Sequence, residues 1–423
     1  MSDKKTVHII GGGLSGLSAA VYIAHKNNKY KIKIYEANNH LGGRCYSYFD
    51  RSFDRILDNC PHLILGINKN FFKLLDIIGC RNSLTAIDPP CYPFIDINKQ
   101  QQWLLQPSKT KIPFWLFRSS KRVPDSGIVD YFEIFKLKYA SEKATVEEIL
   151  SGNHIYESFW LPFCKAVFNS APDKVPANLM YDIIMKVFAK GGSAAVPYLA
   201  NKSLRGAFVE PIVEYLKQSN VEIIYNKKIR GLGIEDRVDR LFFEKGKIFL
   251  EKDDAVIMAV TAENSFKMLP SISTPKETSS IICVHYLVGE NIALPDNKPF
   301  CCIVGGTAEW VFAKKNLLSV VISAPSDELI NKSNEDIAAV IWEDLLKIPA
   351  FPVMEMPKFK VIKEKRATVL HNFKNEKLRK QTLTEFKNLF LAGDWTKTGI
   401  PSSIESAVAS GFTAGKLILK YFS

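Results

Sequence analysis

The sequence has no long uninterrupted apolar run and no cysteine arrangement that suits a metal site. A membrane-spanning helix needs roughly 18 consecutive apolar residues. No window approaches that length, so any membrane contact is expected to be peripheral. The eight cysteines are scattered from Cys45 to Cys302, and the adjacent pair Cys301 and Cys302 lacks the two-residue gap that lets two thiolates hold one zinc. We therefore expect reduced thiols and no metal.

The start of the chain offers little room for a targeting segment. Only the short polar stretch 2–6 precedes the first predicted strand, which leaves no space for a charged, apolar and cleavable leader. Together with reduced cysteines, this favours a cytoplasmic protein. No recognised nucleic-acid-binding motif is present, so we expect no nucleic-acid partner.

Size and composition indicate a globular protein with more than one domain. The 423 residues are 47% apolar and 24% charged, and this length suits a nucleotide-binding domain plus a substrate domain. Lys and Arg outnumber Asp and Glu by 56 to 44, a formal net charge of +12. Such an excess can attract anionic lipid, nucleic acid or a phosphorylated ligand, and charge alone does not choose among them.

The order of the predicted elements indicates two interleaved domains. A strand at 7–10, a glycine-rich turn, a helix at 14–27 and a strand at 31–36 form a βαβ start. The region 66–204 is predicted to be mostly helical, with long loops rich in proline and aromatic residues at 88–124. The remaining predicted elements are strands at 221–225, 238–244, 247–251, 255–260, 281–288, 318–323 and 389–392, and helices at 207–218, 334–346 and 402–420.

This pattern predicts an α/β fold in which a Rossmann-type nucleotide-binding domain carries an inserted α+β substrate domain. The nucleotide-binding domain is expected to be discontinuous and to comprise 1–65, 205–260 and 383–423. The substrate domain is expected to comprise 66–204 and 261–382.

The glycine-rich turn fits a dinucleotide-binding site. Gly11, Gly13 and Gly16 have the G-x-G-x-x-G spacing between a strand and a helix. Gly11 permits the tight turn, Gly13 lets a pyrophosphate approach the backbone, and Gly16 allows close packing of helix on strand. The helix start at Leu14 and Ser15 faces the phosphates. The alternative is an ordinary glycine turn followed by an incidental acid.

A second cluster of glycines distinguishes FAD from NAD. Glu36 ends the second strand, where its carboxylate can accept hydrogen bonds from an adenosine ribose and argues against the 2′-phosphate of NADP. Ala37 follows, and then Gly42, Gly43 and Arg44 in a Leu-Gly-Gly-Arg run. This run resembles the second flavin fingerprint of the amine oxidase and carotenoid desaturase superfamily. The resemblance implies that these residues approach the pyrophosphate of FAD.

The far end of the chain carries a matching half of the site. The strand and turn that end in Gly393 and Asp394 resemble the superfamily's closing segment, where the acid meets the ribityl and phosphate part of FAD. The segment 401–404 then begins a helix whose N-terminus would face the flavin. The structural alternative is that Ser402 and Glu405 form a capping box at the start of this helix. The expected FAD contacts here, with one from the middle of the chain, are Gly393, Asp394, Pro401, Ser402, Ser403, Ile404 and Ile229.

Three longer stretches make the resemblance more specific. Residues 57–66, 159–170 and 393–407 resemble the hydroxysqualene dehydroxylases, the squalene-associated FAD-dependent enzymes of bacterial hopanoid synthesis, and the likeness covers nearly the whole chain. Members usually have Gly-Gln where this chain has Cys60 and Pro61. The resemblance implies an amine oxidase-like fold, and an activity in which reduced FAD replaces the allylic hydroxyl of hydroxysqualene with hydride to give squalene and water.

Such a reaction requires an acid, an apolar tunnel and the exclusion of water, because an allylic C–O bond ionises once its oxygen is protonated. Asp58 and His62 are the candidate catalytic groups, since both lie in the stretch 57–66 that returns toward the cofactor. The structural alternative is that Asp58 terminates a strand and that His62 is a satisfied buried histidine.

The segment 109–122 alternates basic residues with the apolar run 112–117. It could dip into an anionic membrane surface, on the inner face of the membrane, and admit a lipid-dissolved isoprenoid substrate. The alternative is a loop packed on the substrate domain with a solvated rim. The basic residues are Lys109, Lys111, Arg118, Lys121 and Arg122.

Other functions stay open at this stage. A carotenoid desaturase or isomerase would use oxidised FAD to remove hydride from a polyene. A polar-amine oxidase would need an aromatic cage, for which Trp395 is the one obvious wall. A flavin-bound but inactive isoprenoid carrier is the candidate from another class. Because one convincing dinucleotide fingerprint is present, we expect no resident NAD site; the electron donor stays open, and another protein is one candidate.

Overall fold

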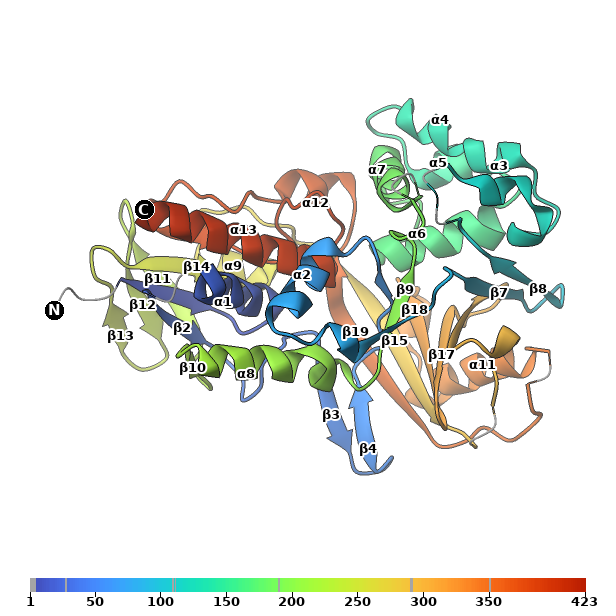
Figure 1. Cartoon of the computed structure of the whole chain (residues 1–423), viewed down its shortest axis with the longest axis horizontal. Helices are drawn as coiled ribbons and strands as arrows, with labels where there is room; N and C mark the ends of the chain where they lie inside the picture. Colours follow the sequence, from blue (N-terminus) through green and yellow to red (C-terminus); the bar gives the residue numbers. More distant parts are fainter. Residues whose placement is uncertain are drawn as a thin grey trace.

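Two sheets at opposite ends of an elongated molecule organise the chain (Figure 1). The computed structural model describes residues 5–26, 29–108, 110, 112–188, 191–289, 292–349 and 351–423. A parallel sheet lies at the end that also holds both chain termini, and a larger, mostly antiparallel sheet lies at the other. We call these the cofactor half and the substrate half.

The parallel sheet is built from segments that are far apart in the sequence. Its strand order is β10–β2–β1–β14–β20. At its centre, β1 (Thr6–Ile10) pairs with β14 (Ala255–Met258), which in turn pairs with β20 (Leu389–Leu391). On the other side lie β2 (Lys31–Tyr35) and β10 (Glu222–Ile224). The three strands β1, β14 and β20 are nearly continuous buried apolar runs because both faces of the sheet are covered there, whereas β2 and β10 carry exposed charged residues.

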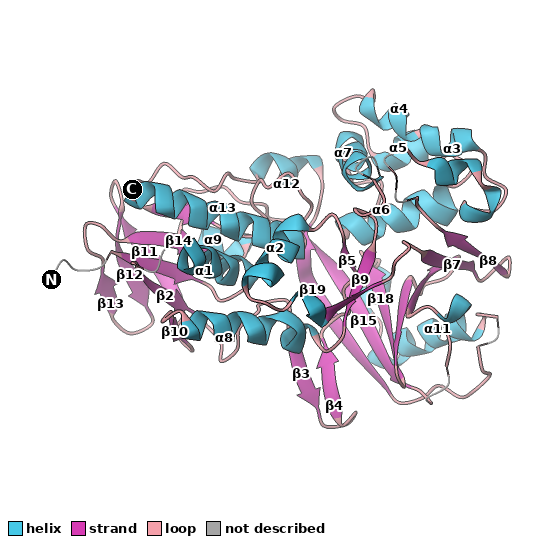
Figure 2. Ribbon diagram, in the orientation of Figure 1, coloured by secondary structure: helices cyan, strands magenta, loops and turns pink. Residues whose placement is uncertain are grey.

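Helices cover one face of this sheet, and a glycine lets two of them approach closely (Figure 2). A Cβ atom at Gly411 would stand 2.3 Å from the carbonyl oxygen of Ser15, so this contact between α13 and α1 requires glycine. The helices of this layer are α1 (Leu14–Lys26), α2 (Lys69–Ile77), α8 (Glu210–Gln218) and α13 (Ile404–Phe422).

The opposite face packs on a small antiparallel sheet of β11 (Ile229–Ile234), β12 (Val238–Phe243) and β13 (Lys247–Phe249). Side chains of a strand alternate between faces. Accordingly, Ile9 belongs to the core under the helices, whereas Ile10 belongs to the core shared with the small sheet.

The substrate half is organised by a seven-stranded sheet with the order β19–β15–β18–β17–β16–β7–β8. All of its pairings are antiparallel except that of β7 with β16. Helix α11 (Asn334–Leu346) contributes most of the helical residues to the core on one face. The strands are β7 (Tyr92–Asp96), β8 (Gln101–Leu105), β15 (Thr278–Leu287), β16 (Phe300–Val304), β17 (Trp310–Lys314), β18 (Leu317–Ser323) and β19 (Phe359–Val369).

The mostly helical region expected at 66–204 contains strands that the sequence did not reveal. Strands β7 and β8 occupy part of the predicted loop region 88–124. Pro93 argues against a strand in the sequence of β7, because proline has no N–H group to donate to a neighbouring strand. Pairing of β7 with β16 begins only at Phe94, so Pro93 lies where β7 has one neighbour, β8.

A cluster of short helices packs beside β7 and β8 (Figure 1). It comprises α3 (Ile128–Phe132), α4 (Ile134–Lys138), α5 (Val146–Leu150), the π-helix η4 (Tyr156–Trp160), α6 (Leu161–Phe168) and α7 (Ala177–Phe188).

The remaining elements connect the two halves or border the sheets. The strands are β3 (Ser47–Asp50), β4 (Arg55–Asp58), β5 (Ile64–Leu65), β6 (Leu84–Ala86) and β9 (Pro197–Ala200). The helices are α9 (Ala262–Met268), α10 (Asp327–Asn331), α12 (Phe373–Leu378), the 3-10 turns η1 (Arg81–Ser83), η2 (Phe114–Phe117), η3 (Ser119–Lys121) and η6 (Pro295–Asn297), and the π-helix η5 (Arg205–Val209).

The predicted α/β architecture is present. The strands of the parallel sheet fall in the segments 1–65, 205–260 and 383–423, and those of the seven-stranded sheet fall in 66–204 and 261–382. None of the helices in the described part of the chain combines the length and apolarity that a bilayer-spanning segment requires.

Candidate active site

A cavity of about 920 Å³ is lined by residues of both halves of the molecule. One end is bordered by the glycine turns after β1 and β2 and by the start of α13. The other end is bordered by side chains of the seven-stranded sheet and of the helical cluster. A ligand in this cavity would therefore touch segments from the whole length of the chain.

The two glycine turns touch each other at the cofactor end. The amide of Gly12 donates to Glu36 Oε2 at 2.8 Å, and the amide of Gly42 donates to the carbonyl oxygen of Gly12 at 2.9 Å. A Cβ atom at Gly43 would stand 3.2 Å from the Cα atom of Gly13. The missing side chains leave a backbone-lined cradle that a phosphate group can approach closely.

Most of the predicted FAD-binding residues of the N-terminal region line the cavity. They are Gly11, Gly13, Leu14, Ser15, Glu36, Ala37, Gly42, Gly43 and Arg44, together with Ile229 from the middle of the chain. Gly16 does not line it. A Cβ atom there would stand 2.1 Å from the carbonyl oxygen of Gly11, so Gly16 serves the close packing of α1 on β1.

Sequence reasoning missed several residues at this end. Asn38, His40, Lys227, Lys228 and Arg230 also line the cavity. The three basic residues flank Ile229 at the start of β11, next to Glu36, because the amide of Lys227 donates to the carbonyl oxygen of Glu36 at 2.8 Å. No local motif marks them, since only the fold brings β11 to this point.

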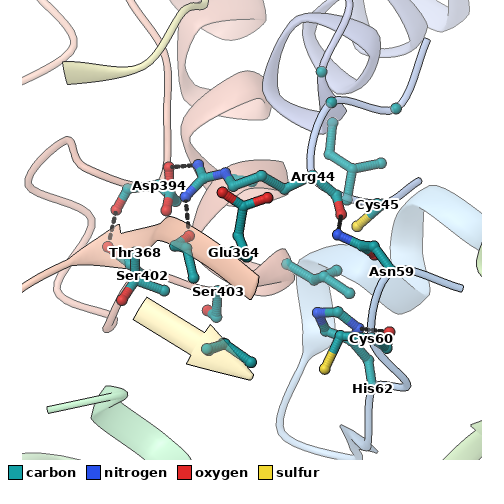
Figure 3. Close-up of a pocket in the computed structure, with 18 of the residues that line it drawn as sticks. Arg44, Cys45, Asn59, Cys60, His62, Glu364, Thr368, Asp394, Ser402 and Ser403 are labelled. Carbon is teal, nitrogen blue, oxygen red and sulfur yellow. Dashed lines mark hydrogen bonds and ion pairs between the residues drawn. The ribbon is translucent and has the colours of Figure 1, made fainter. Parts of the chain in front are cut away.

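Arg44 joins the two ends of the chain. Its Nη2 atom lies 2.5 Å from Asp394 Oδ1, and its Nη1 atom donates to the carbonyl oxygen of Ala367 at 2.5 Å (Figure 3). The charge of Asp394, which is almost fully buried, is the main reason why the pKa of Arg44 is raised. The arginine of the second fingerprint and the acid of the closing turn thus form one unit.

The start of α13 borders the same end of the cavity, but its cap differs from the one that the structural alternative gives. Ser403, not Ser402, is the N-cap residue, and its side chain accepts a hydrogen bond from the amide of Ser406 at 3.2 Å. The alternative interpretation, a capping box of Ser402 and Glu405, is therefore wrong. Glu405 instead accepts hydrogen bonds from the amides of Asn70 (3.0 Å) and Phe71 (2.9 Å), at the start of α2.

The turn before α13 is held by a buried arginine that the sequence did not single out. Arg379 Nη2 donates to the carbonyl oxygens of Asp394 (2.9 Å), Thr396 (2.9 Å) and Ile400 (2.8 Å). Of the residues predicted here, Gly393, Asp394, Ser402, Ser403 and Ile404 line the cavity, and Pro401 does not. Trp395 is buried in the core, where its Nε1 atom donates to the carbonyl oxygen of Val260 at 2.8 Å.

The residues of the cofactor end fit FAD. The cradle at Gly13 and Gly43 suits a pyrophosphate, and the N-termini of α1 and α13 offer free backbone N–H groups. Glu36, at the edge of the same turn, suits a ribose hydroxyl. Arg44 and Asp394 would contact the phosphate and ribityl part of the cofactor.

The substrate end of the cavity is mainly apolar. Most of its walls come from segment 60–65, the seven-stranded sheet and α6. The apolar residues that line it are Leu63, Ile64, Leu65, Tyr92, Phe94, Leu105, Phe159, Phe163, Ala166, Val167, Val187, Ile281, Trp310, Phe312, Val321 and Ile362.

The two predicted catalytic residues have different positions. His62 lines the cavity, and its Nδ1 atom donates to the carbonyl oxygen of Cys60 at 2.9 Å. Burial lowers the pKa of His62, which favours the neutral ring. Asp58 does not line the cavity, because it ends β4 with its Oδ1 atom accepting from Ser47 Oγ (2.6 Å) and from the amide of Leu204 (2.9 Å). The structure therefore brings His62, but not Asp58, to the expected site.

A carboxyl group that the sequence analysis missed also lines the cavity. Glu364, on β19, lies between the cofactor end and the substrate end in Figure 3. In the sequence Glu364 stands among Lys363, Lys365 and Arg366, and such a run of charged residues indicates a solvent-exposed segment. The period-two alternation of β19 was the one signal available.

Comparison with known proteins is consistent with this site. The model of the flavin containing amine oxidoreductase family matches residues 14–419. The solved structure of a putative protoporphyrinogen oxidase from Exiguobacterium has the same fold, with a TM-score of 0.70 at 18% identity over 99% of this chain and 100% of its own. The chain therefore belongs to the flavin-containing amine oxidoreductases, and FAD is its cofactor.

Relatives of known function show which group within this family the chain resembles. The hydroxysqualene dehydroxylase of Zymomonas mobilis is 33% identical over 98% of this chain and 99% of its own length, and that of Rhodopseudomonas palustris is 34% identical over 98% of both. A 15-cis-phytoene desaturase from an Oncidium hybrid is 21% identical over 98% of this chain and 78% of its own. Within its family, the chain thus groups with the hydroxysqualene dehydroxylases.

Proposed function

We propose that this chain catalyses the reductive dehydroxylation of hydroxysqualene to squalene and water, in squalene and hopanoid biosynthesis. The observation that carries the proposal is the cavity itself, in which the FAD-binding residues meet an apolar chamber. The two relatives at about one-third identity, aligned over nearly their full lengths, are named for the same activity.

The apolar chamber suits a long hydrocarbon with one hydroxyl group. Burial of such a chain against Phe159, Phe163 and Trp310 is favourable because it removes apolar surface from water. The same walls exclude water from the reacting carbon. This protects an allylic cation from capture by solvent.

The cofactor end prepares the electron source. When bound, FAD supplies the hydride that replaces the hydroxyl group. The chain's own contribution is to leave room for the pyrophosphate at Gly13 and Gly43, and to place the N-terminus of α13 against the cavity. Partial positive charge at that helix end stabilises negative charge on a reduced flavin ring. Arg379 fixes the turn that precedes the helix.

An anaerobic single-turnover experiment tests the function. The purified flavoprotein is photoreduced and mixed with hydroxysqualene in detergent, and the flavin spectrum is followed while products are extracted for mass spectrometry. We expect rapid reoxidation with one squalene formed per flavin. A flavin that stays reduced, with no squalene, would reject the proposal.

The same experiment separates the two alternatives. A carotenoid desaturase, whose named relatives are less similar, would instead bleach oxidised flavin on mixing with a polyene precursor such as phytoene. An inactive isoprenoid carrier would bind such compounds tightly without any change in flavin oxidation state.

The electrons for reduction are proposed to come from another protein. The sequence contains one convincing dinucleotide fingerprint, and FAD uses it. NADH or NADPH alone should therefore not reduce the flavin of the purified protein under anaerobic conditions, whereas a low-potential protein donor should. Rapid bleaching by either nicotinamide would contradict this.

Peripheral contact with anionic lipid on the cytoplasmic side is the proposed route for the substrate. In the predicted segment, Ile112, Phe114 and Phe117 are exposed beside exposed Arg118, whereas Trp115 is buried against Tyr131 of α3. Lys109 and Lys111 lie outside the described residues. Helices α3 and α4, with Tyr139 directly after α4, add further exposed apolar side chains next to this segment; those in the helices are Val129, Phe132 and Phe135.

Flotation with phosphatidylglycerol vesicles tests the membrane contact. Replacement of Phe114 and Phe117 with Ser should reduce the vesicle-bound fraction several-fold. The matched control is Phe249→Ser, because Phe249 is 65% exposed, close to the 67% of Phe117, but lies on β13 at the other end of the molecule. Equal binding of the control and the double variant would contradict the proposed surface.

A further inference from the structure

Among the described residues, three carboxyl groups line the cavity, and two of them already have close polar partners. Glu36 accepts hydrogen bonds from the amides of Gly12 and Asn38, both at 2.8 Å. Asp394 is paired with Arg44 at 2.5 Å. Glu364 is different, because it accepts only a long hydrogen bond among the described residues, from the amide of Arg366 at 3.4 Å.

The sheet register places Glu364 on an otherwise apolar wall. In the pairing of β15 with β19, Ile281 lies opposite Glu364 and Cys283 lies opposite Ile362. All four side chains line the cavity, as expected for alternate residues on one face of a sheet. A carboxyl group on such a wall is costly to desolvate unless it has a partner, and this favours a functional role over a structural one.

Glu364 also lies at the junction of the two ends of the cavity. Figure 3 shows it near Arg44, with Asp394 and Ser402 to one side and Cys60 and His62 to the other. Glu364 also interacts electrostatically with Arg44, more weakly than Asp394 does. A group at this junction reaches both the flavin end and a substrate that extends into the apolar chamber.

We propose that Glu364 is the catalytic residue that protonates the leaving hydroxyl group of the isoprenoid alcohol. The proposal rests on the proposed function. The carboxyl proton passes to the hydroxyl oxygen, the C–O bond breaks with its electron pair leaving on water, and a hydride from reduced flavin forms the new C–H bond. Glu364 is left as a carboxylate. Because it is half-buried, it regains a proton from solvent before the next turnover.

The other acidic groups near the cavity are less suited to this role. Burial lowers the pKa of His62, so its ring is neutral, and its Nδ1 hydrogen is already used by the carbonyl oxygen of Cys60. Asp58 points away from the cavity to Ser47 and Leu204. Asp394 is already paired with Arg44.

The test is the single-turnover reoxidation of photoreduced enzyme by hydroxysqualene, with Glu364→Gln as the variant. Glutamine keeps the size and hydrogen-bonding ability of the side chain but has no proton to give. General acid catalysis contributes about 100-fold or more to a rate, so we expect reoxidation to slow by at least that factor. Glu364→Asp, which retains the acid but is shorter, should be intermediate. The matched control is Glu277→Gln, outside the cavity next to β15, which should match the unsubstituted protein.

One measurement separates proton donation from a loss of substrate binding. Hydroxysqualene binding to the oxidised flavoprotein, followed by the change in the flavin spectrum, should be unchanged in Glu364→Gln.

The outcomes distinguish the role of Glu364 from the function itself. Formation of squalene by the unsubstituted protein, with Glu364→Gln reoxidising within about threefold of it, would overturn only the role of Glu364. So would a loss of hydroxysqualene binding in Glu364→Gln that accounts for the whole slowing of reoxidation. No squalene from the unsubstituted protein would overturn both.

Discussion

The two ends of the cavity are built in opposite ways. The cofactor end is made largely of backbone, in which the glycine turns and the start of α13 present amide groups and Arg44 and Asp394 satisfy each other. The substrate end is made of apolar side chains from sheet and helices, with few polar groups among them. The cofactor end therefore requires particular residues, such as glycine, at fixed positions. The substrate end requires only that its side chains be apolar and leave a space of the right volume.

The strongest test of this contrast is to add a side chain to the backbone cradle. A Cβ atom at Gly13 would meet only the Cα atom of Gly43, at 3.9 Å, so Gly13→Val should fold. The valine would nevertheless occupy the space of the pyrophosphate. We expect FAD affinity to fall at least about 1,000-fold, or about 4 kcal/mol, in an equilibrium titration of the apoprotein. Gly152→Val, with open space around it, should bind FAD normally.

The next effect concerns acid stability and arises in the substrate half. His285, on β15, is 1% exposed, accepts a hydrogen bond from Ser319 Oγ (2.8 Å) and donates to the carbonyl oxygen of Asp58 (2.9 Å). Burial lowers its pKa to about 4. The unfolded chain, with a histidine pKa of about 6.5, takes up the proton first. Stability should therefore fall as the pH drops from about 6.5 to about 4, by about 3 kcal/mol.

Urea unfolding at a series of pH values measures this loss. In His285→Gln the slope over that range should become markedly smaller, whereas the exposed residue His25, replaced by Gln, should leave the slope as it is. An unchanged slope in His285→Gln would assign the acid sensitivity to other groups.

A smaller effect is expected when the apolar end is made polar. Leu63→Asp should weaken isoprenoid binding by about 2 kcal/mol, or about 30-fold in kcat/KM, because one large apolar contact is lost. Its flavin content should be unchanged, since Leu63 lies outside the cradle. Val353→Asp is the control, because Val353 is 92% exposed. Loss of flavin from Leu63→Asp would show that the two ends are not independent.

The smallest effect separates two helix caps of the same chemistry. Ser403 caps α13 at the cofactor end, and Ser333 caps α11 in the substrate half. Replacement of either by Ala should cost about 1 kcal/mol of unfolding free energy, measured by chemical denaturation. Only Ser403→Ala should also weaken FAD binding, by a few-fold in a titration. Equal FAD affinity in the two variants would remove the start of α13 from the cofactor site.

The contrast between the two ends also explains which parts of the site could be predicted from the sequence. The cofactor end was predictable because glycine spacing at Gly11 and Gly13, and the acid at Glu36, are local signals of a backbone requirement. Long-range consequences were not predictable. The position of Glu405 depends on where α2 begins, and the exclusion of Asp58 from the cavity depends on Ser47 and the chain at Leu204.

Strands and side chains of the substrate half were harder to predict. Pro93 interrupts the alternation of β7, and the basic neighbours of Glu364 hide its cavity-facing position. In both cases the deciding contacts come from strands that are distant in the sequence, namely β16 and β15.

The pairing of Arg44 with Asp394 has a consequence for how the protein is made. Ribosomes synthesise the chain from its N-terminus, and the first half of the nucleotide site exists long before the second. Strand β1 cannot complete its sheet until β14 and β20 have emerged, and the arginine has no acid until the closing turn is translated. Cofactor capture therefore follows translation of almost the whole chain, and a truncated product would be recognisable to the cell as a flavin-free, incompletely folded polypeptide.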